Sequence, residues 1–217
     1  MKKQQHLLNF YQTMSSKMGP SNWWPGESPF EISVGAILTQ NTNWKNVEQA
    51  ILNLKSKDLL NPEKMFFMND EQLAQLIRPA GYFRIKTARL KNFLLFLYNE
   101  CGFNFSVLEK MDLKQLRSKL LEVKGIGPET ADSILLYALN RPSFVVDAYT
   151  QRILNRHSII HEDADYNEIQ ELFTSCLPED VLLFNEYHAL LVRVGKSWCR
   201  KKAPLCSKCP LEIYLEN

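Results

Sequence analysis

The sequence predicts an all-α protein. Apolar residues recur at helical spacing along most of the 217 residues, and no stretch alternates apolar and polar residues for long enough to indicate a β-sheet. Proline, glycine and asparagine interrupt the periodic stretches at short intervals, which is typical of short helices joined by turns. The apolar run Phe144-Val145-Val146 is too short to count as a sheet.

In the N-terminal half, helical spacing predicts helices over residues 3–18, 30–38, 44–54, 70–77 and 85–98, and a short helix starts at Asn61-Pro62-Glu63. Gly19-Pro20 ends the first of these helices, and the polar run Thr39–Asn43 separates the second from the third. Pro62 fits the first turn of its helix. Asn69 with Gln72 predicts a capping box, in which each residue bonds the other's backbone.

In the C-terminal half, the same periodicity predicts helices over residues 112–123, 128–139, 147–157, 166–177 and 179–198. Asp112 with Gln115 predicts a second capping box. The glycine turn Lys124–Pro128 separates the first two of these helices, and the run before Asp147 separates the second from the third.

Composition sets limits on the class of protein. The length allows one large domain or two small ones. No apolar run reaches the roughly 18 residues of a membrane span, and no signal peptide is recognisable, so we expect a cytoplasmic protein. Five cysteines, an odd number, argue against a disulfide framework. The net charge of +2 says little, but basic residues gather near the C-terminus, where they form either a solvated tail or a phosphate-contacting face.

The turn Lys124-Gly125-Ile126-Gly127-Pro128 joins two predicted helices as a helix–hairpin–helix. Glycine allows positive φ and leaves backbone amides uncovered, and the N-terminus of the following helix attracts anions. The turn therefore predicts contact with a DNA phosphate through Lys124, Gly125 and Gly127. Such a contact does not read the base sequence. A plain turn between helices is the alternative that the turn alone leaves open.

Asp147 follows a buried-looking apolar run and precedes a helix, so it predicts an N-cap. A carboxylate at a helix N-terminus is held ionised by the helix dipole and by amides. Such a group could stabilise the positive charge that develops on a sugar when an N-glycosidic bond breaks, and it could orient the attacking water.

The segments KGIGPETA and VVDAYTQRIL, with Asp147 eighteen residues after Glu129, resemble the signature of the endonuclease III superfamily of DNA base-excision glycosylases. ILTQNT and GYFRIKTA resemble the two DNA-inserting segments of that family. The resemblance covers roughly residues 20–210. It implies a central helical subdomain at residues 20–133, a second subdomain formed by residues 1–19 and 134–217, and a DNA-binding cleft between them.

The resemblance implies that Asp147 is the catalytic carboxylate. Bifunctional members carry a lysine, which forms an imine with the sugar, at the position of Glu129. A carboxylate cannot form an imine, so we expect a monofunctional glycosylase that uses water and acts as a monomer on double-stranded DNA containing a damaged base. Two alternatives remain: a glycosylase and abasic-site lyase for oxidised pyrimidines that uses another lysine, and a DNA-binding module without catalysis.

Trp24-Pro25 and Trp44 around the ILTQNT segment resemble the 3-methyladenine branch of the superfamily. That resemblance implies a pocket of aromatic faces for a flipped, positively charged purine, which gains cation–π attraction there. Core packing is the alternative for each tryptophan. The resemblance further implies that Gln40 fills the gap left by the flipped base and that Tyr82 wedges the opposite strand.

Cys199, Cys206 and Cys209 match the spacing of the first three ligands of the family's [4Fe–4S] loop. The fourth position is Leu215. The resemblance therefore implies either a [4Fe–4S] cluster with three cysteine ligands and a different fourth ligand, or a loop that has lost its metal.

Overall fold

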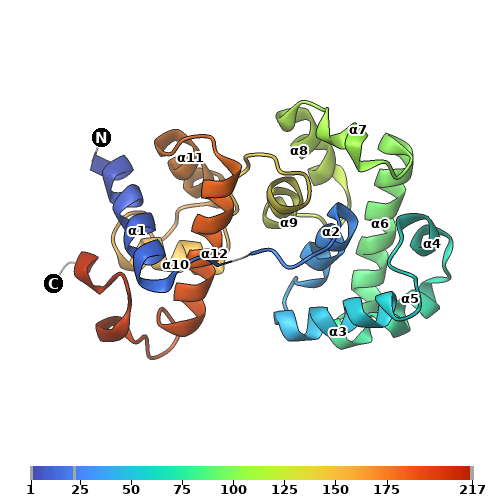
Figure 1. Ribbon diagram of the computed structural model, residues 1–217, viewed down its shortest axis with the longest axis horizontal. Helices are drawn as coiled ribbons and strands as arrows, with labels where there is room; N and C mark the ends of the chain where they lie inside the picture. Colours follow the sequence, from blue (N-terminus) through green and yellow to red (C-terminus); the bar gives the residue numbers. More distant parts are fainter. Residues whose placement is uncertain (1, 22, 216–217) are drawn as a thin grey trace. The chain divides into compact units, whose positions relative to one another are not determined.

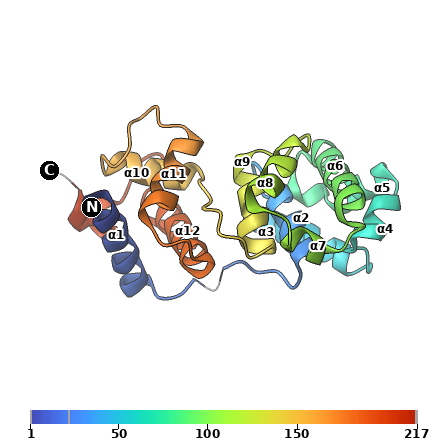
Figure 2. The same ribbon diagram turned by 90° about the horizontal axis from the view of Figure 1, so that it is seen from above.

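The computed structural model describes residues 2–21 and 23–215, and this part of the chain is all-α (Figure 1, Figure 2). It contains twelve α-helices, short 3-10 turns, one π-helical turn and no β-strand. The predicted fold class is therefore confirmed for the described residues. No described helix combines the length and the apolar character needed to cross a membrane.

The chain divides into two compact units. The central unit comprises Trp24–Arg141, and the terminal unit comprises the described residues up to Trp23 and from Pro142 onward. The sequence predicted that the central part would end at residue 133. The observed unit continues to Arg141 because the π-helical turn η2 (Ile134–Ala138) packs against helices of the same unit.

The central unit is built around α2, whose residues are almost all apolar and buried. A helix that is apolar on every side needs neighbours on every side, and α2 packs against α3, α6, α9 and η2. The helices of this unit are α2 (Pro29–Leu38), α3 (Trp44–Lys55), α4 (Pro62–Phe67), α5 (Asp70–Leu76), α6 (Phe83–Cys101), α7 (Phe105–Glu109), α8 (Leu113–Glu122) and α9 (Pro128–Ser133).

The terminal unit packs α12 against α10 and α1 (Figure 1). Its core is aromatic: the Phe144 and Phe173 rings stack with centroids 3.8 Å apart, and the buried Tyr187 hydroxyl donates to the Leu7 carbonyl at 2.8 Å. The helices of this unit are α1 (Lys2–Met18), α10 (Ala148–Arg156), α11 (Tyr166–Cys176) and α12 (Val181–Ser197).

Two helix caps differ from the prediction. Asn69 and Asp112 do cap α5 and α8, but only through their own side chains, and neither forms the two-way capping box. Within the described residues that box occurs at Asp165 and Glu168, which was not predicted. The reason is local: Asn69 bonds the amide two residues on, a short Asx-type turn that does not engage Gln72.

The helix predicted over residues 128–139 is also different. The α-helix ends at Ser133 and continues as the π-helical turn η2, closed by a bond from the Leu139 amide to the Ile134 carbonyl. A π-turn is wider than an α-turn, and all five η2 side chains are buried. The apolar periodicity of the sequence could not show this turn, because side chains on every side of it are apolar and no polar face marks the change of helix type.

Gly195 lets α10 and α12 approach closely. A Cβ atom built at Gly195 would stand 2.3 Å from Tyr149 Cδ1 and 2.6 Å from Tyr149 Cβ. These distances are shorter than real Cβ contacts, so either the tyrosine or a helix would have to move. The Tyr149 side chain thus packs directly against the backbone of α12 at Gly195.

We expect Gly195→Ala to lower the free energy of unfolding by about 1–3 kcal/mol, the usual cost of overpacking a core. Chemical denaturation measures this. Ser197→Ala, at the exposed end of the same helix, is the matched control and should stay within about 0.5 kcal/mol of wild type. Equal effects of the two substitutions would contradict close packing at Gly195.

Candidate functional site

Asp147 is the N-cap of α10 and follows the buried run Phe144–Val146. Its Oδ1 accepts two hydrogen bonds from Thr150, one from the amide at 2.7 Å and one from the hydroxyl at 2.9 Å. The carboxylate is therefore held by its own helix through Oδ1, which leaves its second oxygen, Oδ2, for another contact.

Oδ2 of Asp147 faces His188 on α12. The distance to His188 Nε2 is 3.7 Å, and both side chains are nearly buried, at 11% and 7% exposed. Burial alone would raise the pKa of Asp147, but His188 and the two Thr150 bonds outweigh it and lower the pKa below its ordinary value. The structure therefore favours the ionised carboxylate.

His188 was not among the predicted site residues. The sequence does carry a signal for it, because it is the one histidine in the mostly apolar stretch Tyr187–Val192. A polar residue on the buried face of a helix needs a partner, but the sequence could not show that the partner is Asp147.

The two glycines of the hairpin between α8 and α9 stand there for different reasons. Gly125 has φ +99°, and a Cβ there would stand 2.4 Å from Arg89 Cγ, so only glycine fits. Gly127 has ordinary φ, and a Cβ there would meet nothing within 4 Å. Lys124 and Gly127 are exposed. The missing side chain of Gly127 thus leaves the backbone uncovered on the protein surface and does not make room for an internal neighbour.

The carbonyls of the hairpin are occupied from within the central unit. Asn92 Nδ2 donates to the Lys124 carbonyl at 2.8 Å, and Gln40 Nε2 donates to the Gly125 carbonyl at 3.1 Å. Because both carbonyl oxygens already accept hydrogen bonds, they repel an anion at the hairpin less.

Gln40 is half-buried and held inside the central unit. Besides the Gly125 carbonyl, its Nε2 donates to Thr130 Oγ1 at 2.9 Å. Its Oε1 accepts a bond from Arg89 Nη1. Gln40 therefore links the loop after α2, the hairpin and α6 in this structure. Its predicted role in filling the gap in DNA stays a prediction.

Tyr82 is placed differently. It is 69% exposed and caps α6 with a left-handed backbone, φ 47°. A left-handed tyrosine is uncommon, and it follows Gly81, which also has positive φ. The tight turn holds this large side chain out into solvent.

Trp24, Trp44 and Tyr137 form an aromatic cluster on α2. The rings of Trp24 and Trp44 lie edge to face, with centroids 5.1 Å apart and an interplanar angle of 86°. Trp24 and Tyr137 have centroids 5.1 Å apart at 39°. Both indoles approach within 3.4 Å of the position of a Cβ on Gly35. Because the indoles touch each other, no gap for a third ring lies between them.

Pro25 and Trp23 flank Trp24 in the sequence. Pro25 is exposed. Trp23 belongs to the terminal unit, where Lys196 Nζ lies 5.8 Å from its ring centroid. Trp23 is half-buried.

Glu129 is exposed in the first turn of α9. Its carbonyl accepts a bond from the Ser133 hydroxyl at 2.7 Å, and an acid in this position also suits the helix dipole. The predicted site residues thus divide between the two units. Asp147 and the cysteines lie in the terminal unit, and the aromatic cluster, Gln40, Tyr82 and the hairpin lie in the central unit.

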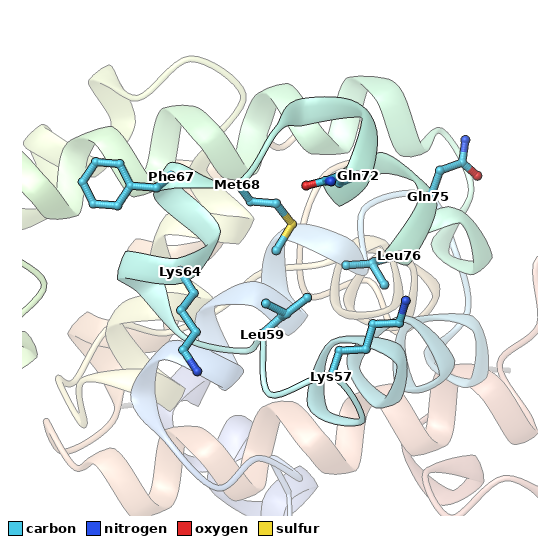
Figure 3. Close-up of a pocket in the computed structure, with 8 residues that line it drawn as sticks. All are labelled: Lys57, Leu59, Lys64, Phe67, Met68, Gln72, Gln75 and Leu76. Carbon is cyan, nitrogen blue, oxygen red and sulfur yellow. The ribbon is translucent and has the colours of Figure 1, made fainter.

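A pocket on the central unit contains none of the predicted site residues (Figure 3). Its apolar side chains Leu59, Met68 and Leu76 converge, and it offers no carboxylate. A pocket without an anion cannot stabilise a positive sugar, so this one does not suit the predicted chemistry. It is lined by Lys57, Leu59, Lys64, Phe67, Met68, Gln72, Gln75 and Leu76.

The C-terminal cysteines lie near one another, and two arginines bond to Cys199. Burial raises the pKa of Cys209, and Cys199 and Cys206 add to the rise. Arg156 Nη1 donates to Cys199 Sγ at 3.2 Å, and Arg152 Nε donates to the Cys199 carbonyl at 2.8 Å.

The cysteine loop as placed does not fit a metal site. Among the described residues, no three His, Cys, Asp or Glu side chains are arranged to hold a metal ion. Leu215, at the fourth position of the loop, offers no ligand atom. The [4Fe–4S] cluster with three cysteine ligands stays a prediction.

Comparison with known proteins identifies the chain's relatives. The model of the HhH-GPD superfamily base excision DNA repair proteins matches residues 34–179. A Methanocaldococcus jannaschii protein, MJ1434, provisionally named a DNA repair glycosylase, is 49% identical over 210 residues, which are 96% of this chain and 94% of MJ1434. Endonuclease III of Thermotoga maritima is 28% identical over 192 residues, covering 87% of this chain and 83% of that protein.

Solved structures have the same fold. Helicobacter pylori 3-methyladenine DNA glycosylase bound to 1,N6-ethenoadenine superposes with a TM-score of 0.76 at 28% identity, covering 88% of this chain and 97% of that one. A non-covalent endonuclease III–DNA complex superposes with a TM-score of 0.82 at 20% identity, covering 98% and 95%.

The lowered pKa of Asp147 makes its contribution to stability depend on pH. An acid whose pKa is lower in the folded chain stabilises the fold above its unfolded value, and this contribution is lost as the pH falls through the folded pKa. The ordinary value is 3.8. Asparagine caps helices about as well as aspartate, so Asp147→Asn mainly removes the charge.

We therefore expect wild type to be more stable than Asp147→Asn near neutral pH, and the difference to close as the pH falls from about 5 to well below 3.8. Urea unfolding at several pH values measures it. A difference that stays constant through this range would show that the ionised carboxylate adds nothing to stability.

Proposed function

Because the chain belongs to the HhH-GPD superfamily of base excision DNA repair proteins and is thus a DNA repair glycosylase, we propose that it removes an alkylated, 3-methyladenine-like base from double-stranded DNA with water as nucleophile. The observation that carries this proposal is Asp147. Its carboxylate is nearly buried, accepts bonds from Thr150 and faces His188, and these contacts lower its pKa and favour the ionised form.

The chemistry follows from this anion. As the bond between the sugar and the base lengthens, electrons leave with the base and positive charge develops on the sugar. A carboxylate fixed close by lowers the energy of that state without having to reorganise. It can also orient the water that adds to the sugar and can accept its proton.

Glu129 supports water rather than an amine as the nucleophile. The family resemblance places the lysine of the bifunctional enzymes at this position, in the first turn of α9. A carboxylate there cannot form an imine with the sugar, so the strand is not cut through this residue.

The aromatic cluster supports an alkylated purine as the substrate. Methylation of a purine ring nitrogen leaves positive charge on the base, and a cation is attracted to aromatic faces. It also makes the base a better leaving group, so little acid assistance is needed. Since the Trp24 and Trp44 rings touch, we propose that the base stacks on an outer face of the cluster, beside Pro25. The structural likeness to the 3-methyladenine enzyme of Helicobacter pylori also supports this substrate class.

The hairpin is the proposed contact with the DNA backbone. Gly127 leaves the surface open for a phosphate, and Lys124 supplies a positive charge beside it. Contacts of this kind hold the duplex without reading its sequence. Tyr82, exposed on its tight turn, is the proposed wedge in the strand opposite the damaged base.

We expect wild-type protein to release methylated bases from duplex DNA, and Asp147→Asn to be slower by about 10²–10⁴-fold, the range for losing such a group. Single-turnover base release, followed by mass spectrometry of the freed bases, measures both quantities. Asp165→Asn is the matched control, because it makes the same change at the exposed N-cap of α11.

The outcomes separate the alternatives. Equal rates for wild type and Asp147→Asn would remove Asp147 from the mechanism. Tight DNA binding with no base released from any damaged duplex would favour the non-catalytic binding module. Release of oxidised pyrimidines alone would exclude the alkylated-base assignment.

We expect borohydride to trap no wild-type protein on damaged DNA, because no lysine occupies the position of Glu129. Glu129→Lys restores an amine there, and we expect a covalent complex with this variant. Gel electrophoresis of borohydride-treated mixtures detects it, and Glu129→Gln is the neutral control. A trapped wild-type complex would show that another lysine acts and that the enzyme is bifunctional.

A further inference from the structure

The pocket on the central unit has a chemical character of its own. Its volume is about 640 Å³, which is within the range of ligand-binding pockets. Its floor is apolar, because the half-buried side chains of Leu59, Met68 and Leu76 converge there (Figure 3). The lysine and glutamine side chains that line it are exposed and form its rim. An apolar floor inside a polar rim is typical of a surface that receives one large side chain of a partner.

The walls of the pocket are held from the interior of the central unit. The Lys91 ammonium of α6 donates to the Phe66 carbonyl at 2.8 Å and also to the Met68 carbonyl. Asn53 Nδ2 of α3 donates to the Leu76 carbonyl at 3.0 Å. These bonds fix the backbone at two of the three floor residues. The pocket is therefore preformed, and a preformed pocket loses less conformational freedom when it binds.

Lys57 is the cation on the rim that is available to a ligand. It is exposed and takes part in no ion pair among the residues that the structure describes. The second lysine of the rim, Lys64, is already paired with Asp58. No carboxylate is among the side chains that line the pocket. A carboxylate on the ligand therefore finds its partner at Lys57.

The surface next to the pocket disfavours a nucleic acid as the ligand. Phe67 is 79% exposed, and an exposed aromatic ring near lysines suits a stacked base. Carboxylates, however, follow or precede the lining residues in the chain. Asp58, Asp70 and Glu71 have side chains that are 91%, 75% and 55% exposed. These acids repel a polyanion, whereas a single carboxylate can still approach Lys57.

We propose that this pocket docks a short segment of a partner protein, in which one large apolar side chain stands beside an acidic residue. The apolar side chain covers the floor, and the carboxylate pairs with Lys57. The amides of Gln72 and Gln75 on the rim can bond to the backbone of the segment. No residue of the proposed reaction lines the pocket, so the docking does not depend on the proposed function.

The test selects binders for the wild-type protein from a library of displayed random peptides. A parallel selection uses Gln72→Trp, because Gln72 borders the pocket from an exposed position on α5 (Figure 3) and an indole there fills the opening. We expect wild type to enrich peptides in which a large apolar residue stands beside Asp or Glu, and Gln72→Trp to enrich none of these peptides.

One enriched peptide, labelled with fluorescein, is then titrated with each protein, and its fluorescence anisotropy gives the affinity. We expect replacement of its large apolar residue by serine to weaken binding about tenfold or more, because burial of that side chain is lost. Lys57→Glu weakens binding about fivefold, and this effect shrinks as the salt concentration rises. Lys57 is exposed, so this variant also tests the pocket should Gln72→Trp fail to fold.

Gln115→Trp is the matched control, because it makes the same change at an exposed position of α8, and we expect it to bind the peptide as wild type does. Enrichment of the same peptides by Gln72→Trp would place the binding elsewhere and overturn the proposal. An enriched set dominated by Lys and Arg, or no enrichment at all, would also overturn it. Displacement of the peptide by a single-stranded oligonucleotide would show instead that the pocket binds nucleic acid.

Discussion

The central unit depends on the buried ammonium group of Lys86. Chain segments that end in the interior leave carbonyls without helical partners, and such groups are costly when they are buried unpaired. Lys86 satisfies one at the end of α2 and one at the end of the 3-10 turn η1 (Arg78–Ala80). Burial, together with the nearby Arg89, lowers the pKa of Lys86 to about 8. The ammonium group thus fixes the points from which the Gln40 loop and the Tyr82 turn begin.

In the terminal unit, one carboxylate has both a structural and a proposed chemical role. Asp147 starts α10 as an N-cap, and the bonds that make it a cap also hold it in its ionised form. Because burial acts in the opposite direction, His188 and Thr150 are needed to keep the charge. The contacts that stabilise the fold at Asp147 are therefore the same contacts that the proposed reaction needs.

Glycine has different tasks at three positions in the fold. Gly195 makes room for Tyr149, so that two helices can touch. Gly125 adopts a backbone angle that other residues avoid and leaves space for the stem of Arg89. Gly127 has neither constraint and instead leaves the outer surface bare. The Gly-Ile-Gly pattern was visible in the sequence. Only the surrounding residues in the structure show that glycine is needed for a different reason at each of the two positions.

The sequence by itself determined the helical class, most of the helix positions, the hairpin and the N-cap at Asp147, because these depend on local periodicity, caps and turns. Tertiary structure alone decided the rest. It turned the end of the predicted helix 128–139 into a π-turn, and it brought His188 to Asp147 from a helix far along the chain. It also set Trp24 against Trp44 and placed Gln40 between Arg89 and Gly125. Such contacts arise from how distant segments pack, and no local pattern of residues encodes them.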